Sequence, residues 1–158
     1  MTDIAHVTLP DLPIEGGCQC GKLRYRITKP PLTYYACHCT VCQRQSGSAF
    51  GSSLMLAADG IELTRTFETF GHAGGSGRPM ECTFCPTCGV RITHQIIGSD
   101  ILVVKPGTLD HKSWLIPAGH IFTATRLPWI RLGEKDGLIY KDAPDMSALR
   151  ERWRQMTA

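Results

Sequence analysis

The sequence predicts a mainly β fold that ends in one C-terminal helix. Short segments in which apolar and polar residues alternate are typical of half-buried strands, and 16 glycines and 10 prolines supply turns between them. An apolar stripe at helical spacing occurs near the end of the chain. The length of 158 residues fits one domain. We therefore expect strands with antiparallel connections and a helix packed on a sheet.

The predicted strands follow an irregular start. Prolines interrupt residues 1–15, and we expect these residues to form a loosely ordered N-terminal arm. From Lys22 onward, Leu23, Tyr25 and Ile27 alternate with basic side chains, which predicts a half-buried strand. Further strands are expected at residues 32–36, 49–56, 61–70, 90–97, 101–104 and 121–125.

Residues 71–79 are too rich in glycine for a strand or a helix, so we expect an exposed loop. Such a loop is either a plain connection between strands or a lid over a site. Its glycines lack the spacing of a phosphate-binding loop, which favours the plain connection.

The C-terminal helix is expected to begin after Asp145, because aspartate is a preferred helix N-cap. Met146, Leu149, Trp153 and Met156 recur at helical spacing and form its buried stripe. The opposite side is expected to be a solvated face formed by Arg150, Arg152 and Arg154.

Charge and hydropathy exclude several classes of function. The formal net charge of +3 is too small for bulk attraction to nucleic acid or to a membrane surface. A membrane helix needs roughly 20 apolar residues in a row, and no window approaches that length. Residues 1–12 lack a basic stretch followed by an apolar run, so we expect no secretory signal and a cytoplasmic location. No nucleic-acid or membrane partner is expected.

Eight cysteines carry the strongest functional signal. In a reducing compartment, clustered thiols bind metal more often than they form disulfides. The pair Cys18 and Cys20 and the pair Cys85 and Cys88 are each followed by a glycine, which relieves the strain of a tight turn whose N–H groups point at the sulfurs. Because structural zinc takes four thiolates tetrahedrally, we predict that these four cysteines hold one structural zinc ion.

A second group has a different construction. Cys37, Cys39 and Cys42 offer three thiols within six residues, and no glycine follows them directly. Three protein ligands leave one position of a tetrahedral zinc open to water or substrate, which is the arrangement of a catalytic site. The sequence therefore predicts a second, catalytic zinc. Two alternatives stay open, in which His38 or Cys82 closes this site as a fourth ligand.

Cys82 also raises the question of an iron–sulfur cluster, because it stands three residues before Cys85 in the spacing Cys-x2-Cys-x2-Cys. The corresponding ferredoxin motif requires a fourth cysteine followed by proline, and the chain has Ile92 and Thr93 there. Cys82 is therefore expected to be a buried apolar thiol near the zinc.

Residues 16–25 (GGCQCGKLRY), 37–50 (CHCTVCQRQSGSAF) and 84–89 (FCPTCG) together resemble the glutathione-dependent formaldehyde-activating (GFA) enzyme family, which includes centromere protein V. Weaker likeness extends the match over residues 16–140. The resemblance implies several coiled antiparallel β-sheets around cysteine-bound zinc. It also implies that the four-cysteine group is structural and the three-cysteine group catalytic. The chain then divides into an N-terminal arm (1–15), a GFA-type zinc-binding domain (16–140) and a C-terminal helical extension (141–158).

The activity that the resemblance implies is condensation of glutathione with formaldehyde to S-hydroxymethylglutathione, formally a carbon–sulfur lyase working in reverse. Because glutathione carries carboxylates, a cation is needed near the open metal position. Arg44 is the best candidate, and Ser46 and Ser48 can add hydrogen bonds. Alternatively, Arg44 is an exposed loop residue and the serines cap a turn.

Other roles stay open at this point. His94 shares an apolar strand face, as a core histidine does, whereas His120 starts a predicted strand and is either structural or part of a pocket. The chain is alternatively a non-catalytic zinc-binding module for a macromolecular partner, or a GFA-like enzyme for another thiol and electrophile. The sequence assigns no catalytic side chain and no oligomeric state.

Overall fold

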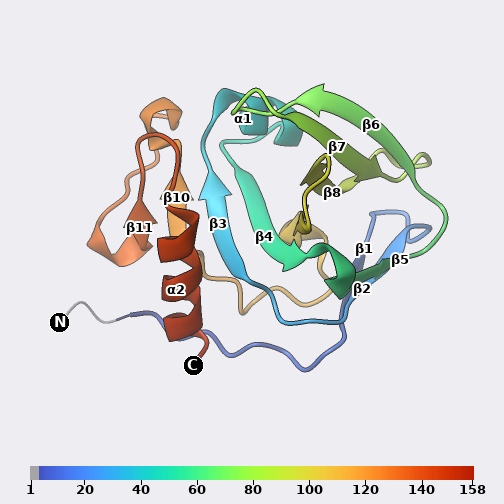
Figure 1. Ribbon diagram of the computed structural model, residues 1–158, viewed down its shortest axis with the longest axis horizontal. Coiled ribbons are helices and arrows are strands. Elements are labelled where there is room, and N and C mark those ends of the chain that lie inside the picture. The colour runs from blue at the N-terminus through green and yellow to red at the C-terminus, as the bar shows by residue number, and fades with distance from the viewer. Residues whose placement is uncertain (1–3) are drawn as a thin grey trace. The chain divides into compact units, whose positions relative to one another are not determined.

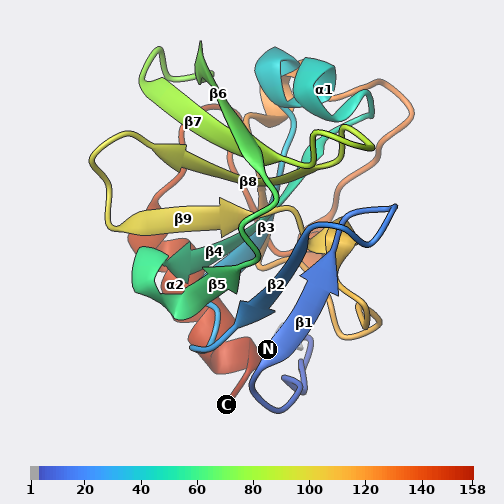
Figure 2. The ribbon, with the colours of Figure 1, turned by 90° about the vertical axis from the view of Figure 1, so that its right-hand side faces the viewer.

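The computed structural model describes residues 4–158, whose helices and strands are drawn in Figures 1 and 2. These residues form two compact units. Among the described residues, the first unit contains residues 4–9, Leu32–Ser53 and Trp114–Ala158, and the second contains Pro10–Pro31 and Leu54–Ser113. Each unit is therefore assembled from segments that are far apart in the sequence. Strand β4 (Gly51–Ala57) begins in the first unit and ends in the second.

The first unit is built on a parallel arrangement of strands. The order is β11 (Leu138–Ile139), β10 (Gly119–Ile121) and β3 (Thr33–Cys37). β10 runs parallel to both neighbours, and Ile121 lies beside Cys37 at the end of β3. Gly119 permits the close approach of β11, because a Cβ there would lie 2.5 Å from the Leu138 carbonyl oxygen. The remaining elements are α1 (Thr40–Ser46), α2 (Met146–Met156) and the 3-10 helices η3 (Thr123–Thr125) and η4 (Glu134–Asp136).

α2 confirms the predicted C-terminal helix. The Asp145 carboxylate caps it by accepting hydrogen bonds from the backbone N–H groups two and three residues further on, at 2.9 and 3.1 Å. Of the predicted buried stripe, Leu149, Trp153 and Met156 are buried, whereas Met146 is only half-buried. The Thr33 hydroxyl of β3 donates to the Leu149 carbonyl at 3.2 Å, which joins the helix to the sheet.

The second unit contains antiparallel sheets, which supports the predicted mainly β fold. The smaller sheet has the order β1-β2-β5, with bounds Ile14–Gly17, Arg24–Ile27 and Ile61–Leu63 (Figure 2). The larger has the order β4-β9-β8-β7-β6, in which β9 is Ile101–Val104, β8 is Arg91–Ile96, β7 is Pro79–Phe84 and β6 is Glu68–Ala73. Two 3-10 helices, η1 (Ala58–Gly60) and η2 (Pro106–Thr108), connect strands.

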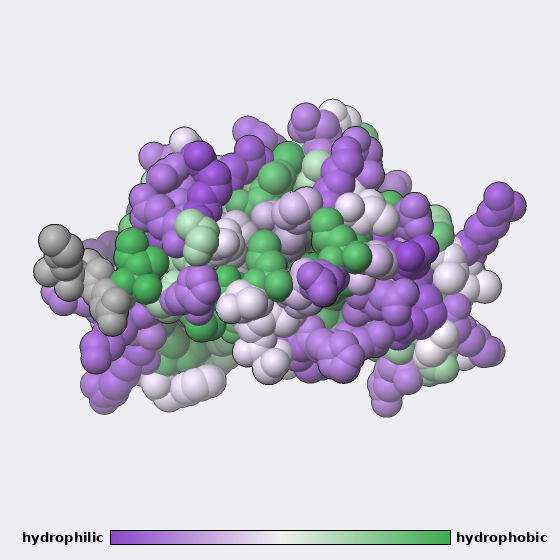
Figure 3. Space-filling view, turned by 90° about the horizontal axis from the view of Figure 1, so that it is seen from below, coloured by the Kyte–Doolittle hydropathy of each residue, from purple (hydrophilic) through white to green (hydrophobic). Residues whose placement is uncertain are grey.

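The alternation read from the sequence of β2 is confirmed. Tyr25 and Ile27 are buried and Arg26 is exposed. Large buried side chains of the second unit come from its strands and loops, namely Leu23, Tyr25, Ile27, Leu56, Ile92, Val104 and Leu109. On the face drawn in Figure 3, hydrophobic residues are scattered among hydrophilic ones. Across residues 4–158, no helix has the length and apolar character needed to cross a bilayer.

The predicted strand at 61–70 is interrupted. β5 ends at Leu63 and β6 begins at Glu68. Between them, the Thr66 hydroxyl donates to the Lys22 carbonyl at 2.7 Å, and the Thr64 hydroxyl accepts from the Arg24 N–H at 3.0 Å. These side-chain hydrogen bonds to the backbone compete with a continuous strand and divide it.

The exposed loop predicted at 71–79 is confirmed at residues 74–78 and is wrong at its two ends, where residues 71–73 and residue 79 belong to strands. β6 continues to Ala73, β7 begins at Pro79, and a short turn joins them as a hairpin. The Gly74 N–H donates to the Arg78 carbonyl at 2.8 Å and closes this turn. Cross-strand pairing, which the glycine content does not reveal, holds these residues extended.

The strand predicted at 121–125 is also wrong beyond its first residue. Phe122 has a φ of 52°, in the left-handed region that ends an extended strand, and η3 follows. β10 instead occupies the residues just before. Its parallel pairing also departs from the antiparallel connections that we expected.

Two smaller differences concern the termini. β1 begins at Ile14, inside the arm expected at 1–15, because Ile14 pairs with Ile27 of β2. Of the arginines expected in water, Arg154 is exposed, whereas Arg150 and Arg152 are half-buried. Residues 1–3 of the arm lie outside the described residues.

Replacing Trp153 with alanine should destabilise the protein by about 3–5 kcal/mol, because a buried aromatic side chain is lost and leaves a cavity. Trp153 is 1% exposed and its ring lies 6.5 Å from that of Trp114. Chemical denaturation should show this loss, while Gln155→Ala on the exposed side of α2 should change stability by less than about 0.5 kcal/mol. Equal effects of the two substitutions would contradict the packing of α2.

Candidate metal centres

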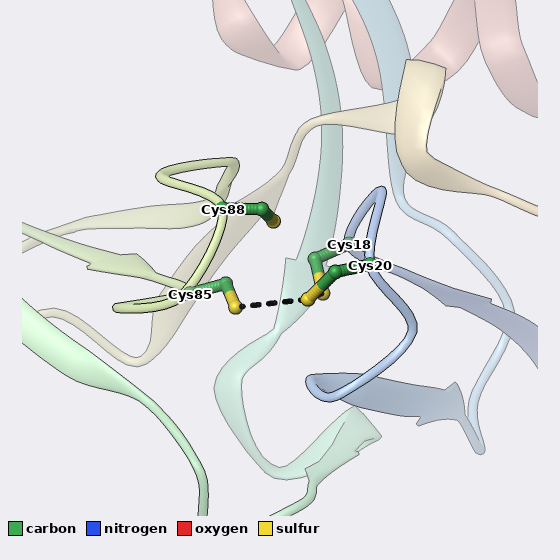
Figure 4. A group of neighbouring side chains, drawn as sticks. All are labelled: Cys18, Cys20, Cys85 and Cys88. Atoms are coloured by element: carbon green, nitrogen blue, oxygen red, sulfur yellow. Dashed lines mark hydrogen bonds between the residues drawn. The ribbon is translucent and has the colours of Figure 1, made fainter.

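Four cysteine side chains converge in the second unit (Figure 4). Cys18 and Cys20 come from the turn after β1, and Cys85 and Cys88 come from the turn between β7 and β8. Their sulfur atoms all lie within 4.8 Å of one another. The Sγ atoms of Cys18 and Cys20 are 3.5 Å apart, and those of Cys20 and Cys85 are 3.7 Å apart. Four converging sulfurs are the donor set of a structural zinc site.

The two turns have the backbone conformation that the sequence predicts. Gly21 has a φ of 81° and Gly89 a φ of 76°, both in the left-handed region where glycine is favoured. The Gly89 N–H donates to the Cys85 carbonyl at 2.8 Å. The Leu23 N–H donates to the Cys18 sulfur at 3.3 Å, which stabilises a negatively charged sulfur.

Hydrogen bonding distributes charge unevenly over these sulfurs. Burial raises the pKa of Cys18, but the Leu23 N–H and the neighbouring thiols lower it more, to about 6. Backbone N–H groups, first that of Val90, also lower the pKa of Cys88. For Cys20, the Lys22 N–H lowers the pKa, whereas burial and the neighbouring thiols raise it to a net value of about 11. A site that already favours thiolates at Cys18 and Cys88 suits a divalent cation.

Three further cysteines converge in the first unit. Cys37 ends β3, Cys39 is the N-cap of α1, and Cys42 lies in the first turn of that helix. Their sulfurs lie within 4.8 Å of one another. The Cys42 N–H donates to the Cys39 sulfur at 3.3 Å, so this sulfur is held at the start of the helix. Cys37 is buried, and the other two are partly accessible.

In the three-cysteine group, the thiolate form is favoured most at Cys39. Its sulfur accepts hydrogen bonds from the thiols of Cys37 and Cys42 and from backbone N–H groups, which lower its pKa to about 2. The Cys37 thiol donates to Cys39 and is also buried, so its pKa is raised strongly. Cys39 therefore favours the thiolate form and Cys37 the thiol form, which would release its proton to a metal. The sulfur donors of the group fit zinc, with one tetrahedral position left over.

The structure gives His38 a role other than the fourth ligand. Its ring is fully buried, and Nε2 lies 2.9 Å from Nδ1 of His120. Burial, then the nearby His120 and Arg126, lower the pKa of His38 to about 4, so the ring is neutral near pH 7. Burial also lowers the pKa of His120. His120, whose role the sequence left open, is therefore part of the support behind the three-cysteine loop.

Cys82 lies outside both groups of converging sulfurs in the described part of the chain. It is fully buried on β7, and its sulfur lies 3.7 Å from Nη1 of Arg91. This placement agrees with the buried thiol expected from the sequence and gives no support to Cys82 as the closing ligand.

The three residues expected to bind substrate lie at the end of α1. Arg44 and Ser48 are exposed. The Ser46 hydroxyl donates to the Cys42 carbonyl at 2.8 Å, and Gly47 follows with the left-handed φ of 60° that ends the helix. Ser46 therefore uses its hydroxyl hydrogen to finish the helix and can only accept a hydrogen bond from a ligand.

Sequence reasoning missed two polar side chains at this site, Gln43 and Thr125, which contact the backbone between Cys37 and Cys39. Gln43 stands directly after Cys42, which is the single local signal for its involvement. Thr125 has no such signal, because its approach depends on the parallel pairing of β10 with β3.

Comparison with known proteins gives consistent similarities. The family model described as glutathione-dependent formaldehyde-activating enzyme matches residues 13–125. A curated protein of Halomonas elongata, named "Putative glutathione-dependent formaldehyde-activating enzyme", is 30% identical over 83 residues, or 48% of this chain and 51% of that protein. The chain thus spans about half the length of this relative. A crystal structure of a Rhodobacter sphaeroides protein covers 61% of this chain and 88% of its own, with a TM-score of 0.48 and 19% identity.

The two centres should respond differently to loss of a ligand. Wild-type protein should contain about two zinc ions per chain, and Cys85→Ser and Cys42→Ser should each contain about one. Cys85→Ser should also lower Tm substantially, because its site joins segments far apart in sequence, whereas Cys42→Ser should lower Tm little, because its site is one local loop. Elemental analysis and circular dichroism melts measure both effects, and equal Tm losses would refute this division.

A pH-dependent contribution to stability is expected from His94 on β8. Burial, then Lys105, Arg91 and His72, lower its pKa well below the usual value. The unfolded chain therefore binds this proton first, and stability falls as pH drops below about 6.5. His94→Gln should reduce the slope of unfolding free energy against pH, between about pH 6.5 and 5, by up to about 1.4 kcal/mol per pH unit. Urea denaturation at several pH values tests this, with the exposed His6→Gln as control; an unchanged slope in His94→Gln would reject it.

Proposed function

The chain belongs to the glutathione-dependent formaldehyde-activating enzyme family, and on this basis we propose that it condenses glutathione with formaldehyde at the Cys37, Cys39 and Cys42 site. The product is S-hydroxymethylglutathione, so the chain works as a carbon–sulfur lyase in the synthetic direction. The observation that carries the proposal is the convergence of three sulfurs, rather than four, from one short loop.

The number of sulfurs separates the roles of the two centres. Four sulfurs fill a tetrahedral zinc, so Cys18, Cys20, Cys85 and Cys88 would hold a structural ion. The three sulfurs of the other centre leave one position for an outside ligand. A zinc ion held there supplies a Lewis acid that favours the thiolate form of a substrate thiol near neutral pH.

The proposed reaction is an addition in which atoms and electrons balance without an oxidant. The thiol loses its S–H proton, and a bond forms between sulfur and the carbonyl carbon of formaldehyde. The π electrons of the carbonyl move to oxygen, which gains a proton and becomes a hydroxyl. The partly accessible Cys39 and Cys42 leave an approach for a small thiol, while the buried Cys37 anchors the loop.

Arg44 is the proposed anchor for a carboxylate of glutathione. It lies in the last turn of α1, two residues after Cys42, and its side chain is exposed. Within residues 4–158 its guanidinium forms no salt bridge, so it is available to an anionic ligand. Ser48, also exposed at this end of the helix, and the Ser46 oxygen are proposed to complete the contact.

The reducing cytoplasm is the proposed location, because it keeps both the site thiols and glutathione reduced. A small-molecule thiol is accordingly the proposed partner.

At equilibrium, glutathione and formaldehyde interconvert with their adduct, and the zinc-loaded protein should accelerate this interconversion. The addition proceeds in water without a catalyst, so magnetisation-exchange NMR, which measures the rate of interconversion, is the suitable assay. Cys42→Ser should lose the acceleration, because the site loses one of its three sulfurs. If the wild type does not accelerate the interconversion more than Cys42→Ser does, the proposed activity is wrong. That outcome would favour a binding module or another pair of substrates.

The same assay tests the substrate contact. Arg44→Ala should raise the glutathione concentration needed for half-maximal exchange about tenfold, as expected for loss of a charged hydrogen bond. The maximal exchange rate should change little, because Arg44 binds a part of the substrate that does not react. Arg154→Ala, which removes an exposed arginine from α2, provides the matched control.

A further inference from the structure

We propose that Gln43 and Thr125 are positioning residues that hold the three sulfurs of Cys37, Cys39 and Cys42 in place by fixing the backbone of His38. This inference rests on the proposed function in that the three sulfurs are taken to hold a metal. It goes further by assigning the geometry of that site to two side chains that touch neither metal nor substrate.

The first step is the environment of the His38 peptide groups. The His38 carbonyl accepts hydrogen bonds from Nε2 of Gln43 and from the Thr125 hydroxyl, both at 2.9 Å. The His38 N–H donates to the Ile121 carbonyl, also at 2.9 Å. Both backbone polar groups of the residue between Cys37 and Cys39 are thus held, and most of these partners lie more than 80 residues away in the sequence.

The second step is the chemistry of Gln43. Its amide nitrogen has two hydrogens, and two carbonyl oxygens face it: that of His38 at 2.9 Å and that of Thr125 at 2.8 Å. The amide therefore bridges the metal loop to the chain after β10. A carboxylate in the same place would offer no donor and would repel both carbonyls.

The third step is the position of Gln43 next to Cys42. The helix that carries Cys42 is tied through this one side chain to the peptide between Cys37 and Cys39. A single amide therefore links the parts of the backbone that present all three sulfurs.

The side chain of His38 closes the other side of this arrangement. Its ring is fully buried, lies 5.2 Å from the Phe50 ring, and contacts His120 through Nε2. The peptide and the ring of His38 are both fixed, so the directions of Cys37 and Cys39 on either side are fixed as well. Such preorganisation matters because a metal site binds tightly only when its ligand side chains are already held in the binding geometry.

The test uses Gln43→Glu and Thr125→Val, which keep the side-chain shape and remove the donors. Chelator competition should show that zinc affinity of the weaker, three-sulfur site falls about 10- to 100-fold, the range typical of groups that orient metal ligands. In protein loaded with cadmium, the NMR resonance of the three-sulfur site should shift or broaden, while that of the four-sulfur site stays in place as an internal reference. Thr125→Ser, which restores the hydroxyl, should recover both the affinity and the resonance.

Two controls separate positioning from general stability. Gln155→Glu adds the same charge on α2 and should leave both cadmium resonances and both affinities unchanged. The melting temperatures of the Gln43 and Thr125 variants should stay within a few degrees of the wild type. Unchanged resonances in Gln43→Glu and Thr125→Val would overturn the proposal, as would changes at both sites together or a failure of Thr125→Ser to rescue. None of these readouts needs glutathione or formaldehyde, so an inactive wild type would reject the proposed function alone.

Discussion

The repulsion between crowded sulfurs is the constraint on which the rest of the structure depends. Thiolates within 4.8 Å of one another are unfavourable unless protons, N–H groups or a cation compensate them. Both clusters use the backbone for part of this compensation, through the Leu23 N–H at Cys18 and the Cys42 N–H at Cys39. A bound divalent ion would complete it, and the left-handed glycines and the helix N-terminus are the local structures that make the N–H groups available.

The two clusters bring their sulfurs together in different ways, one from segments far apart in the sequence and the other from a single short loop. In the second unit, the turns after β1 and β7 bring Cys18 and Cys88 together, so a metal bound there would close a long loop and stabilise the fold. In the first unit, six consecutive residues carry all three cysteines, so a metal bound there would close almost no loop. Its geometry must come from other contacts, and the parallel β10 supplies them by placing His120 and Thr125 behind the loop.

Local signals in the sequence were sufficient for much of this structure. The positive φ angles of Gly21 and Gly89, the Asp145 cap and the buried face of β2 all follow from neighbouring residues, and each was predicted. Features set by pairing between strands or by an unusual backbone angle were not predicted. The glycine-rich hairpin depends on pairing between β6 and β7, and β10 ends where Phe122 turns left-handed, which no residue type at that position indicates.

The candidate site also has a part that the sequence predicts and a part that it does not. The seven candidate ligand cysteines are recognisable because of their close spacing and because a glycine follows Cys20 and Cys88. The support of the three-sulfur loop is not recognisable, because the contact of His38 with His120 spans 82 residues. An open metal position has two requirements. The site must offer only three ligands, which the sequence shows, and its backbone must be held in place without a fourth ligand, which requires contacts that form only in the folded chain. The residues around His38 are therefore as much a part of the site as the sulfurs that they align.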